Sequence, residues 1–519
     1  MAKLDWLETA VFYNIYPQSF YDTNGDGIGD LNGIIEKLDY VKEMGFNAIW
    51  INPFYVSPFK DAGYDVTDFY TVAPRYGTNG DFIRLCRKAK DMGIKIIVDL
   101  VAGHTSLECE WFKKSALPEK NEYTNRYIWT DSTWNKGKDG LFISGYSDRD
   151  GCYMSNFFYC QPALNYGFAN VEEEWQLPVD HPDCVATKKE LINIMEYWIG
   201  LGADGFRVDM ASSLIKNDPD HSAVMKFWQE IRELFDKKYP DCVLISEWSY
   251  PKKAINGGFH IDFMIHFNVK CYTTLFRYEK GTNQHNDWIG HSFFRKEGKG
   301  NFNEFLEEYM DHYNATVGKG YIAIPTGNHD MPRISLGRDF DDLKVAYAFI
   351  LTMPGVPFVY YGDEIGMRYI ENLPSKEGGY NRTGARTPMQ WGSGKNLGFS
   401  ESDTPYLPVD DREDAPTVEK QLKDPDSLLN FVKELIKIRK AHPALCASGG
   451  FKVINSGYPL LYERFTDEEK IRVLINPSER NYEIDENLCD KIILSKNAQI
   501  RDNKIQIGGR GCMIYSVRT

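Results

Sequence analysis

The sequence predicts an α/β fold, a (β/α)8 TIM barrel with a subdomain inserted after strand 3 and a C-terminal antiparallel β domain. Eight short, β-rich apolar runs alternate with eight amphipathic stretches. This alternation indicates a parallel sheet with helical crossovers, and eight repeats favour a closed barrel. A segment rich in Tyr, Asn, Ser and Gly interrupts this alternation. After the last helix of the pattern, short runs of alternating polarity follow.

The barrel elements are expected in strict order along the chain. The expected strands cover 11–20, 47–53, 95–101, 205–211, 242–248, 261–267, 321–326 and 358–361. The expected helices cover 34–44, 81–92, 188–201, 223–239, 252–256, 302–317, 343–353 and 428–442. The last helix shows the apolar stripe that packs on a sheet, because Leu428, Val432, Leu435 and Ile438 recur at spacings of three and four.

Three domains follow from this order. The barrel is expected to comprise 1–104 and 186–445, the inserted subdomain 105–185, and the C-terminal β domain 446–519. The runs at 471–475, 491–494 and 513–517 are typical of short antiparallel strands. The stretch 368–424 is polar and rich in Gly, Pro and Asp, so we expect a long loop that crosses the mouth of the barrel before the last helix.

Composition excludes several classes of protein. The net charge of −14 repels phosphate backbones, so no nucleic-acid partner is expected. No run of 18 apolar residues predicts a membrane span, and the N-terminus shows no basic region followed by an apolar one. The ten cysteines form neither CxxC nor zinc spacing, which favours reduced thiols. We therefore expect a cytoplasmic protein, either a monomer or a small homo-oligomer.

Ionisable side chains stand at the ends of four expected strands. These are Asp99 and His104 at the third, Arg207 and Asp209 at the fourth, Glu247 at the fifth, and His329 and Asp330 after the seventh. Active sites of such barrels lie at the carboxyl ends of the strands. One Asp at a strand end often only caps a helix. Several such groups within apolar runs indicate chemistry, because burying charges close together is costly.

The carboxylates suit glycoside hydrolysis, which needs two carboxyl groups with separated pKa values. Arg207 and Asp209 share one face of a strand, so the guanidinium would keep Asp209 ionised as a nucleophile. Glu247 follows an apolar run that would raise its pKa, which suits a proton donor. Asp330, next to His329, would hold sugar hydroxyls and strain the sugar ring.

Four motifs carry a resemblance to a known family. DLVAGHTS at 99–106, GFRVDMA at 205–211, ISEWS at 245–249 and TGNHD at 326–330 resemble those of the α-amylase family, glycoside hydrolase family 13, in the family's order. The resemblance implies a retaining mechanism with Asp209 as nucleophile, Glu247 as general acid/base and Asp330 as transition-state stabiliser. It also implies sugar contacts by Arg207, His104 and His329, and it matches Asp99 to the aspartate of the first motif.

Two further segments narrow the resemblance. DAGYDV from Asp61 and ARTPMQW around Arg386 resemble oligo-1,6-glucosidases, dextran glucosidases and related α-glucosidases. In that group an Asp and an Arg at these positions grip the non-reducing-end glucose, and Tyr64 would stack on its ring. A charged clamp behind one sugar forbids internal cleavage. The implied function is a retaining, exo-acting α-glucosidase on short malto- or isomalto-oligosaccharides.

Other functions stay open at this point. A transglycosylase or isomerase on maltose or sucrose would use the same glycosyl-enzyme, and an endo-acting α-amylase would share the three acids. A non-enzymatic partner subunit is disfavoured, because the transporter heavy chains of this superfamily have a membrane span and lack the acids. The residue after the nucleophile helps to select the linkage in these enzymes. Here it is Met210, which matches neither familiar choice.

A calcium site is expected just after the first strand. Residues 22–30 place oxygen-bearing side chains at alternate positions with glycines between them, as in the first nine positions of a calcium loop. The twelfth position is Gly33, so the loop is not a full EF-hand. The segment resembles the calcium loop of oligo-1,6-glucosidase-like enzymes, which implies structural Ca²⁺ on the side chains of Asp22, Asn24, Asp26 and Asp30 and the carbonyl of Ile28.

Two positions depart from the family pattern. Gly103 stands where the first motif usually has an Asn, a calcium ligand at the junction of barrel and insert in α-amylases. That second calcium site is therefore not expected. In the insert, QPALN resembles the family's QPDLN, with Ala163 in place of the Asp.

Overall fold

A computed structural model describes residues 4–138, 141–282, 288–485, 489–502 and 504–518. Eight parallel strands form one sheet in the order β11-β10-β9-β8-β5-β2-β1-β12. Their bounds are β1 Phe12–Ile15, β2 Ala48–Ile51, β5 Lys95–Leu100, β8 Gly205–Val208, β9 Val243–Ser246, β10 Ile261–Phe263, β11 Tyr321–Ala323 and β12 Phe358–Tyr360. Each lies within an expected strand or shares its core, so the eight predicted strands are confirmed.

The sheet closes between β11 and β12. A parallel bridge joins Pro325 to Phe358, the N–H of Val356 donates to the carbonyl of Ile322 at 3.2 Å, and the N–H of Thr326 donates to the carbonyl of Phe358 at 3.0 Å. These contacts bring the two outer strands together, which confirms the predicted barrel. The carboxyl ends of all eight strands therefore meet at one end of the molecule.

Helices connect the strands, as expected for parallel neighbours. Their bounds are α1 Leu31–Glu36, α2 Leu38–Glu43, α3 Asn79–Asp91, α5 Pro182–Leu201, α6 Ser222–Lys238, α7 Pro251–Asn256, α8 Cys271–Phe276, α9 Phe302–Thr316, α10 Phe340–Thr352, α11 Val418–Lys423 and α12 Leu428–Ala441. The helix expected at 34–44 is two helices. They meet at Lys37, whose ψ of 5° is not helical and whose N–H is shared between the carbonyls of Gly33 and Ile34.

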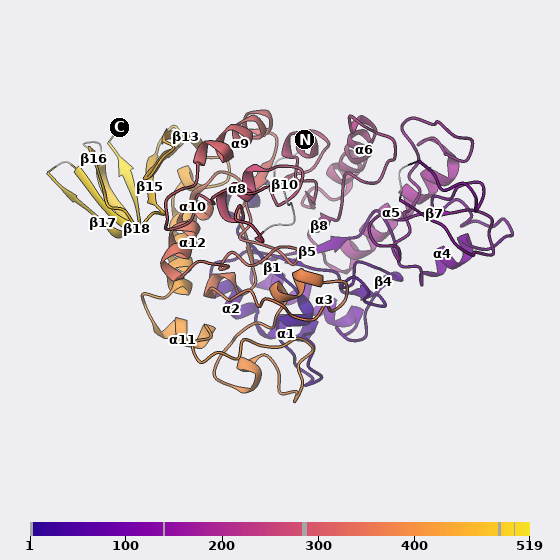
Figure 1. Cartoon of the computed structure of the whole chain (residues 1–519), viewed down its shortest axis with the longest axis horizontal. Helices are drawn as coiled ribbons and strands as arrows, with labels where there is room; N and C mark the ends of the chain where they lie inside the picture. The colour runs from indigo at the N-terminus through magenta and orange to yellow at the C-terminus, as the bar shows by residue number, and fades with distance from the viewer. Residues whose placement is uncertain (1–3, 139–140, 283–287, 486–488, 503, 519) are drawn as a thin grey trace.

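The segment between β5 and β8 projects from the barrel (Figure 1). It contains α4 Glu110–Ser115 and an antiparallel pair of short strands, β6 Phe142–Ile143 and β7 Tyr153–Met154. Helix α5 begins at Pro182, before the predicted domain boundary at 186. A second short pair, β3 Tyr55–Val56 and β4 Asp68–Val72, follows β2 and was not predicted.

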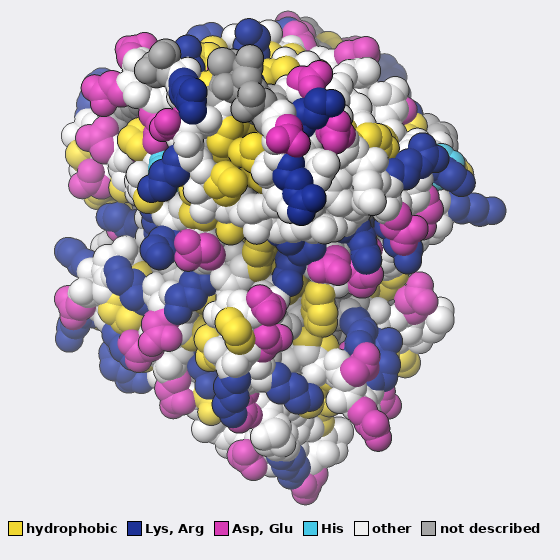
Figure 2. All heavy atoms as spheres, turned by 90° about the vertical axis from the view of Figure 1, so that its left-hand side faces the viewer, with side chains coloured by type: hydrophobic (Ala, Val, Ile, Leu, Met, Phe, Trp, Pro, Cys, Tyr) yellow, Lys and Arg dark blue, Asp and Glu magenta, His cyan; other side chains and the backbone are white. Residues whose placement is uncertain are grey.

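The C-terminal strands form a separate antiparallel sheet at the opposite end of the view (Figure 1). The strands are β13 Gly450–Asn455, β14 Leu460–Phe465, β15 Lys470–Asn476, β16 Tyr482–Asp485, β17 Cys489–Arg501 and β18 Lys504–Val517. Arg464, buried on β14, donates to the carbonyl of Thr352 at the end of α10 and so fastens this sheet to the barrel. Figure 2 views the molecule from the side of this sheet and shows positively and negatively charged side chains mixed over the surface.

The helices and the cysteines can be compared with the expectations of no membrane span and of reduced thiols. None of the helices in the described part of the chain is both long and apolar enough to cross a membrane. Nine of the ten cysteines are buried thiols outside any disulfide, as a reduced core requires.

Candidate active site

A pocket of about 500 Å³ lies at the carboxyl ends of the barrel strands. Its walls come from the loops after β2, β5, β8, β9, β10 and β11, from the insert and from the 368–424 segment. It is lined by Asp61, Tyr64, His104, Phe157, Asp209, Met210, Ser212, Glu247, His266, Phe267, Asn268, His329, Asp330 and Arg382. The structure thus brings the three predicted acids together, and each follows a different strand.

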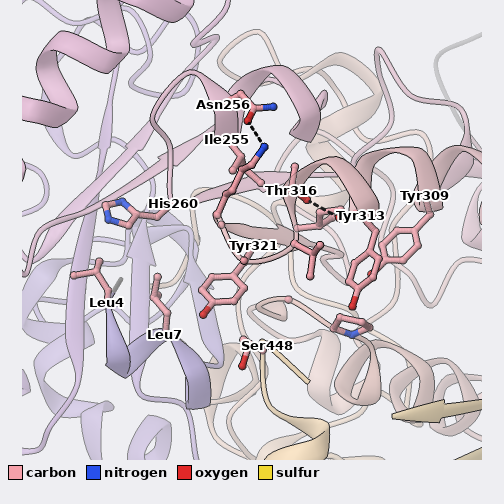
Figure 3. A pocket seen from close by; sticks show the side chains of 18 residues that line it. Leu4, Leu7, Ile255, Asn256, His260, Tyr309, Tyr313, Thr316, Tyr321 and Ser448 are labelled. Carbon is pink, nitrogen blue, oxygen red and sulfur yellow. Dashed lines mark hydrogen bonds between the residues drawn. The ribbon is translucent and has the colours of Figure 1, made fainter. Parts of the chain in front are cut away.

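A second cavity, of about 450 Å³, lies where β10, β11 and β12 begin, at the other end of the barrel (Figure 3). It is surrounded by helices α7 and α9, by the segment around Leu4 and Leu7, and by the side chains of His260 and Tyr321. Among the described residues that line this cavity there is no carboxylate. Of these two cavities, judged by the described residues that line them, the first carries the carboxyl groups that glycoside chemistry needs.

One guanidinium connects the carboxylates at the floor of the pocket. Arg207, on β8, is 1 % exposed. Its Nη1 donates to Asp99 at 2.9 Å and to Asp209 at 3.0 Å, and its Nη2 lies 2.6 Å from Glu247 Oε1. Three acids from three neighbouring strands are thus held on a single cation. This arrangement follows from the strand order β9-β8-β5, which places Arg207 in the middle.

The two central carboxyl groups both have raised pKa values. Burial raises the pKa of Asp209 well above its ordinary value, and the negative charge of Glu247 raises it further. Burial also raises the pKa of Glu247, although Arg207 opposes this. We expected Arg207 to keep the pKa of Asp209 low. That expectation is wrong, because burial and the second carboxyl group outweigh the guanidinium. Two interacting carboxyl groups of this kind can serve as one acid and one carboxylate.

Asp330 differs from this pair, because it is ionised. Burial alone would raise its pKa, but His329 and two arginines beside it lower that pKa well below the usual range. His329 Nε2 lies 3.1 Å from Asp330 Oδ2, while Asn52 Nδ2 lies 3.0 Å from His329 Nδ1. Because an amide NH₂ can only donate, the proton of the neutral ring is on Nε2 and points to Asp330. Tyr64 stacks on the same ring, at 5.1 Å between centroids.

Arg382 is a site residue that the sequence did not single out. It lies in a 3₁₀ helix, Tyr380–Ala385, within the polar segment expected to cross the barrel mouth. Its Nη1 lies 2.6 Å from Asp330 Oδ1 and its Nη2 lies 3.5 Å from Asp61 Oδ1, so it bridges both acids. Arg386, the predicted clamp, lies 3.3 Å from Asp330 and donates to the carbonyl of His329. The sequence did offer one indication of Arg382, because the segment that contains it was expected to cross the mouth of the barrel.

The insert also reaches the pocket. Gln161 donates to Asp61 Oδ2 at 2.8 Å, and Asn156 Nδ2 lies 3.1 Å from His104 Nδ1. Burial lowers the pKa of His104 to about 3, so the ring is neutral. At Gly103 a Cβ would lie 2.6 Å from Asn156 Nδ2, so a side chain there would require Asn156 to move. Nothing in the structure explains the choice of Ala163.

The predicted calcium loop lies outside the pocket. Asp22 Oδ1 accepts from the N–H of Asn24 at 3.1 Å, and Asp26 Oδ1 accepts from the N–H of Ile28 at 2.8 Å. Asp30 caps the first turn of α1. Across the described residues, no group of three or more His, Cys, Asp or Glu side chains is arranged to hold a metal ion. The oxygen donors suit calcium chemically, and the site stays a prediction.

Comparisons with known proteins agree with this geometry. The model of the α-amylase catalytic domain matches residues 14–448. A probable oligo-1,6-glucosidase 2 from Bacillus subtilis is 33 % identical, covering 91 % of this chain and 90 % of its own. A trehalose synthase/amylase TreS from Mycolicibacterium smegmatis is 31 % identical, over 88 % of this chain and 79 % of its own length.

Solved structures give the same result. A mutant isomaltulose synthase from Erwinia rhapontici, in complex with its natural substrate sucrose, superimposes with a TM-score of 0.82 at 26 % identity, covering 99 % of both chains. Together with the matched family model and the barrel geometry, these relatives assign the fold and the class of chemistry. The chain belongs to the α-amylase family and is a glycoside hydrolase family 13 enzyme.

Proposed function

We propose that the protein is a retaining, exo-acting α-glucosidase that releases glucose from the non-reducing end of short malto- or isomalto-oligosaccharides. The observation that supports this most directly is the pocket itself. Four carboxyl groups line it, those of the three proposed catalytic acids and of Asp61, and the bridge from Asp61 to Arg382 to Asp330 lies across one side. A sugar seated between the acids would meet this charged bridge, which leaves no room for a second sugar beyond it.

The proposed mechanism has two displacements. The Asp209 carboxylate attacks the anomeric carbon while Glu247 gives its proton to the leaving oxygen, so a carbon–carboxylate bond replaces the glycosidic bond. Glu247 then takes a proton from water, the water attacks the same carbon, and Asp209 is released. Asp330 stays ionised and favours the positive charge that develops on the ring. Retention requires the two carboxyl groups to be close, and their contacts with one guanidinium support that.

A transglycosylase or isomerase is a second candidate. It is supported by the similarity to a trehalose synthase and to an isomaltulose synthase, each over most of this chain. Both activities would start from the same glycosyl-enzyme and differ in whether water or a sugar accepts the glucosyl group. Met210, Phe267 and Asn268 also line the pocket and are not fully buried, so they could contact an acceptor.

Product analysis tests the proposal. The enzyme is incubated with maltose, isomaltose, sucrose, trehalose and maltoheptaose, and the products are separated by chromatography. We expect glucose as the first product, released as the α-anomer in an NMR time course. New disaccharides from maltose or sucrose would favour the transglycosylase. Early internal fragments of maltoheptaose would favour an endo-acting α-amylase and contradict the exo mode.

Glucose binding should weaken as the pH falls through about 6. Burial raises the pKa of Asp61 to about 6, against the opposing charges of Arg382 and Arg386. Below that pH Asp61 gains a proton, so it loses its charge interaction with Arg382 and its strength as an acceptor for sugar hydroxyls. Calorimetric titration with glucose at several pH values measures the effect. The Asp61→Asn variant should bind weakly at every pH, and an unchanged pH dependence in that variant would exclude Asp61 as the titrating group.

We infer further that residues 22–30 bind structural calcium through Asp22, Asn24, Asp26, Asp30 and the Ile28 carbonyl. Chelation should then lower the melting temperature, because a ligand of the folded state adds about 2.7 kcal/mol at about 100 times its Kd. Differential scanning calorimetry with and without a chelator measures this shift. Calcium should restore the melting temperature better than magnesium does. An Asp26→Ala variant should not respond, and an equal response would disprove the site.

A further inference from the structure

A buried carboxylate on β10 contacts the chain on both sides of Glu247. Asp262 is fully buried. Its Oδ1 accepts from the Ser246 hydroxyl at 2.7 Å and from the N–H of Trp248 at 3.1 Å, and its Oδ2 accepts from the N–H of Tyr250 at 2.8 Å. Ser246 and Trp248 are the immediate neighbours of Glu247. One side chain on the adjacent strand thus contacts the residues immediately before and after the proposed proton donor.

The ladder between β9 and β10 explains why such support is needed. The last residues in register are Ser246 and Asp262. Beyond them the backbone of Glu247 bonds to the other side, where its N–H donates to the carbonyl of Val208 at 2.9 Å and its carbonyl accepts from the N–H of Ala211 at 3.1 Å. The Asp262 side chain therefore takes over where the ladder to β10 ends.

The loop beyond Glu247 has a conformation that needs to be held. Ser249 has a φ of 54°, a left-handed value that is uncommon for a residue with a side chain. Its hydroxyl oxygen accepts from the N–H of Ile265 at 3.1 Å, and Asn268 donates to the carbonyl of Trp248 at 2.8 Å. These bonds join the loop to the segment after β10, and Asp262 supplies the bonds nearest to Glu247.

We propose that Asp262 is a positioning residue that sets the direction in which Glu247 delivers its proton. The proposal rests on the proposed function, in which Glu247 is the general acid/base. An asparagine at 262 would keep one acceptor oxygen, but its NH₂ group would face a backbone N–H that needs an acceptor. The loop that follows Glu247 would then shift, while Arg207 would still hold the carboxyl group of Glu247.

Two substrates with different leaving groups distinguish a misplaced acid from a general loss of active enzyme. Maltose needs a proton on its leaving oxygen when the bond at the anomeric carbon breaks. α-Glucosyl fluoride does not, because fluoride leaves with the bonding electron pair as the Asp209 carboxylate forms its bond to carbon. We expect Asp262→Asn to lower kcat/KM on maltose, or on isomaltose if that is the better substrate, by ~10²-fold, since a small misplacement of a reacting group has that cost. On the fluoride kcat/KM should fall severalfold at most, because it reports only the steps up to the glycosyl-enzyme and not the later attack by water.

Matched variants complete the experiment. Glu364→Gln alters another buried carboxylate, which accepts from Tyr13 and Tyr40 in the core. Burial raises the pKa of Glu364 to about 7, as it does that of Asp262. Glu364→Gln should lower activity on both substrates in equal proportion. Ser246→Ala removes one donor to Asp262 and should give a smaller loss of the same selective kind.

The ratio of the two activities does not depend on the folded fraction, so a partly misfolded variant still gives an answer. The inference is overturned if Asp262→Asn and Ser246→Ala lower both activities equally or lower neither. A wild-type enzyme that cleaves neither substrate would instead refute the proposed function. The two failures are therefore distinguishable.

Discussion

Asp209→Asn should lower kcat for α-glucoside cleavage by ~10²–10⁴-fold or more, while the fold stays intact. The amide has nearly the same shape as the carboxylate, but it cannot form the glycosyl-enzyme. Arg207 keeps its contacts to Asp99 and Glu247, so the buried cation still has charged partners. Steady-state kinetics on maltose and isomaltose give the loss, and circular dichroism against temperature checks the fold.

Glu247→Gln is the matched control for this prediction. It should lose as much activity on maltose, because no proton reaches the leaving oxygen. On α-glucosyl fluoride, however, Glu247→Gln should retain its first step, whereas Asp209→Asn should not, since the nucleophile is needed for both substrates. A near-normal rate on maltose in either variant would refute the roles proposed for these two residues.

Arg382→Ala should lower kcat/KM on short substrates by ~10²-fold and increase internal cleavage of maltoheptaose. The change removes the cation that bridges Asp61 and Asp330, and breaking a buried ion pair at one partner costs several kcal/mol. It also removes the barrier that supports the exo mode. Kinetics on maltose and chromatography of the maltoheptaose products measure the two effects.

Arg386→Ala gives the comparison. Arg386 contacts Asp330 and the carbonyl of His329, and it is 2 % exposed. Its loss should slow the reaction without a change in product pattern. If instead Arg386→Ala increases internal cleavage and Arg382→Ala does not, the clamp predicted from the sequence is right and the bridge through Arg382 has no role in the exo mode.

Local sequence was enough for the eight barrel strands and for the acids at their ends. Each barrel strand is a short apolar run, and Asp209 and Glu247 follow β8 and β9 directly, so chain order alone places them at one end of a barrel. The same reasoning failed at Lys37, where one expected helix is two, and at α8, which is six residues long. Short or broken helices leave too few turns for a periodic pattern to be visible.

The sequence by itself determined the order of the elements, the family and the acids that meet in the pocket, because these depend on local patterns and chain direction. Only the tertiary structure decided that Arg382 bridges Asp61 and Asp330, that burial raises the pKa values of Asp209 and Glu247, and that Asp262 contacts the residues beside Glu247. Those contacts join residues that are distant in the chain or depend on how deeply a charge is buried. Packing fixes both, and no local pattern records either.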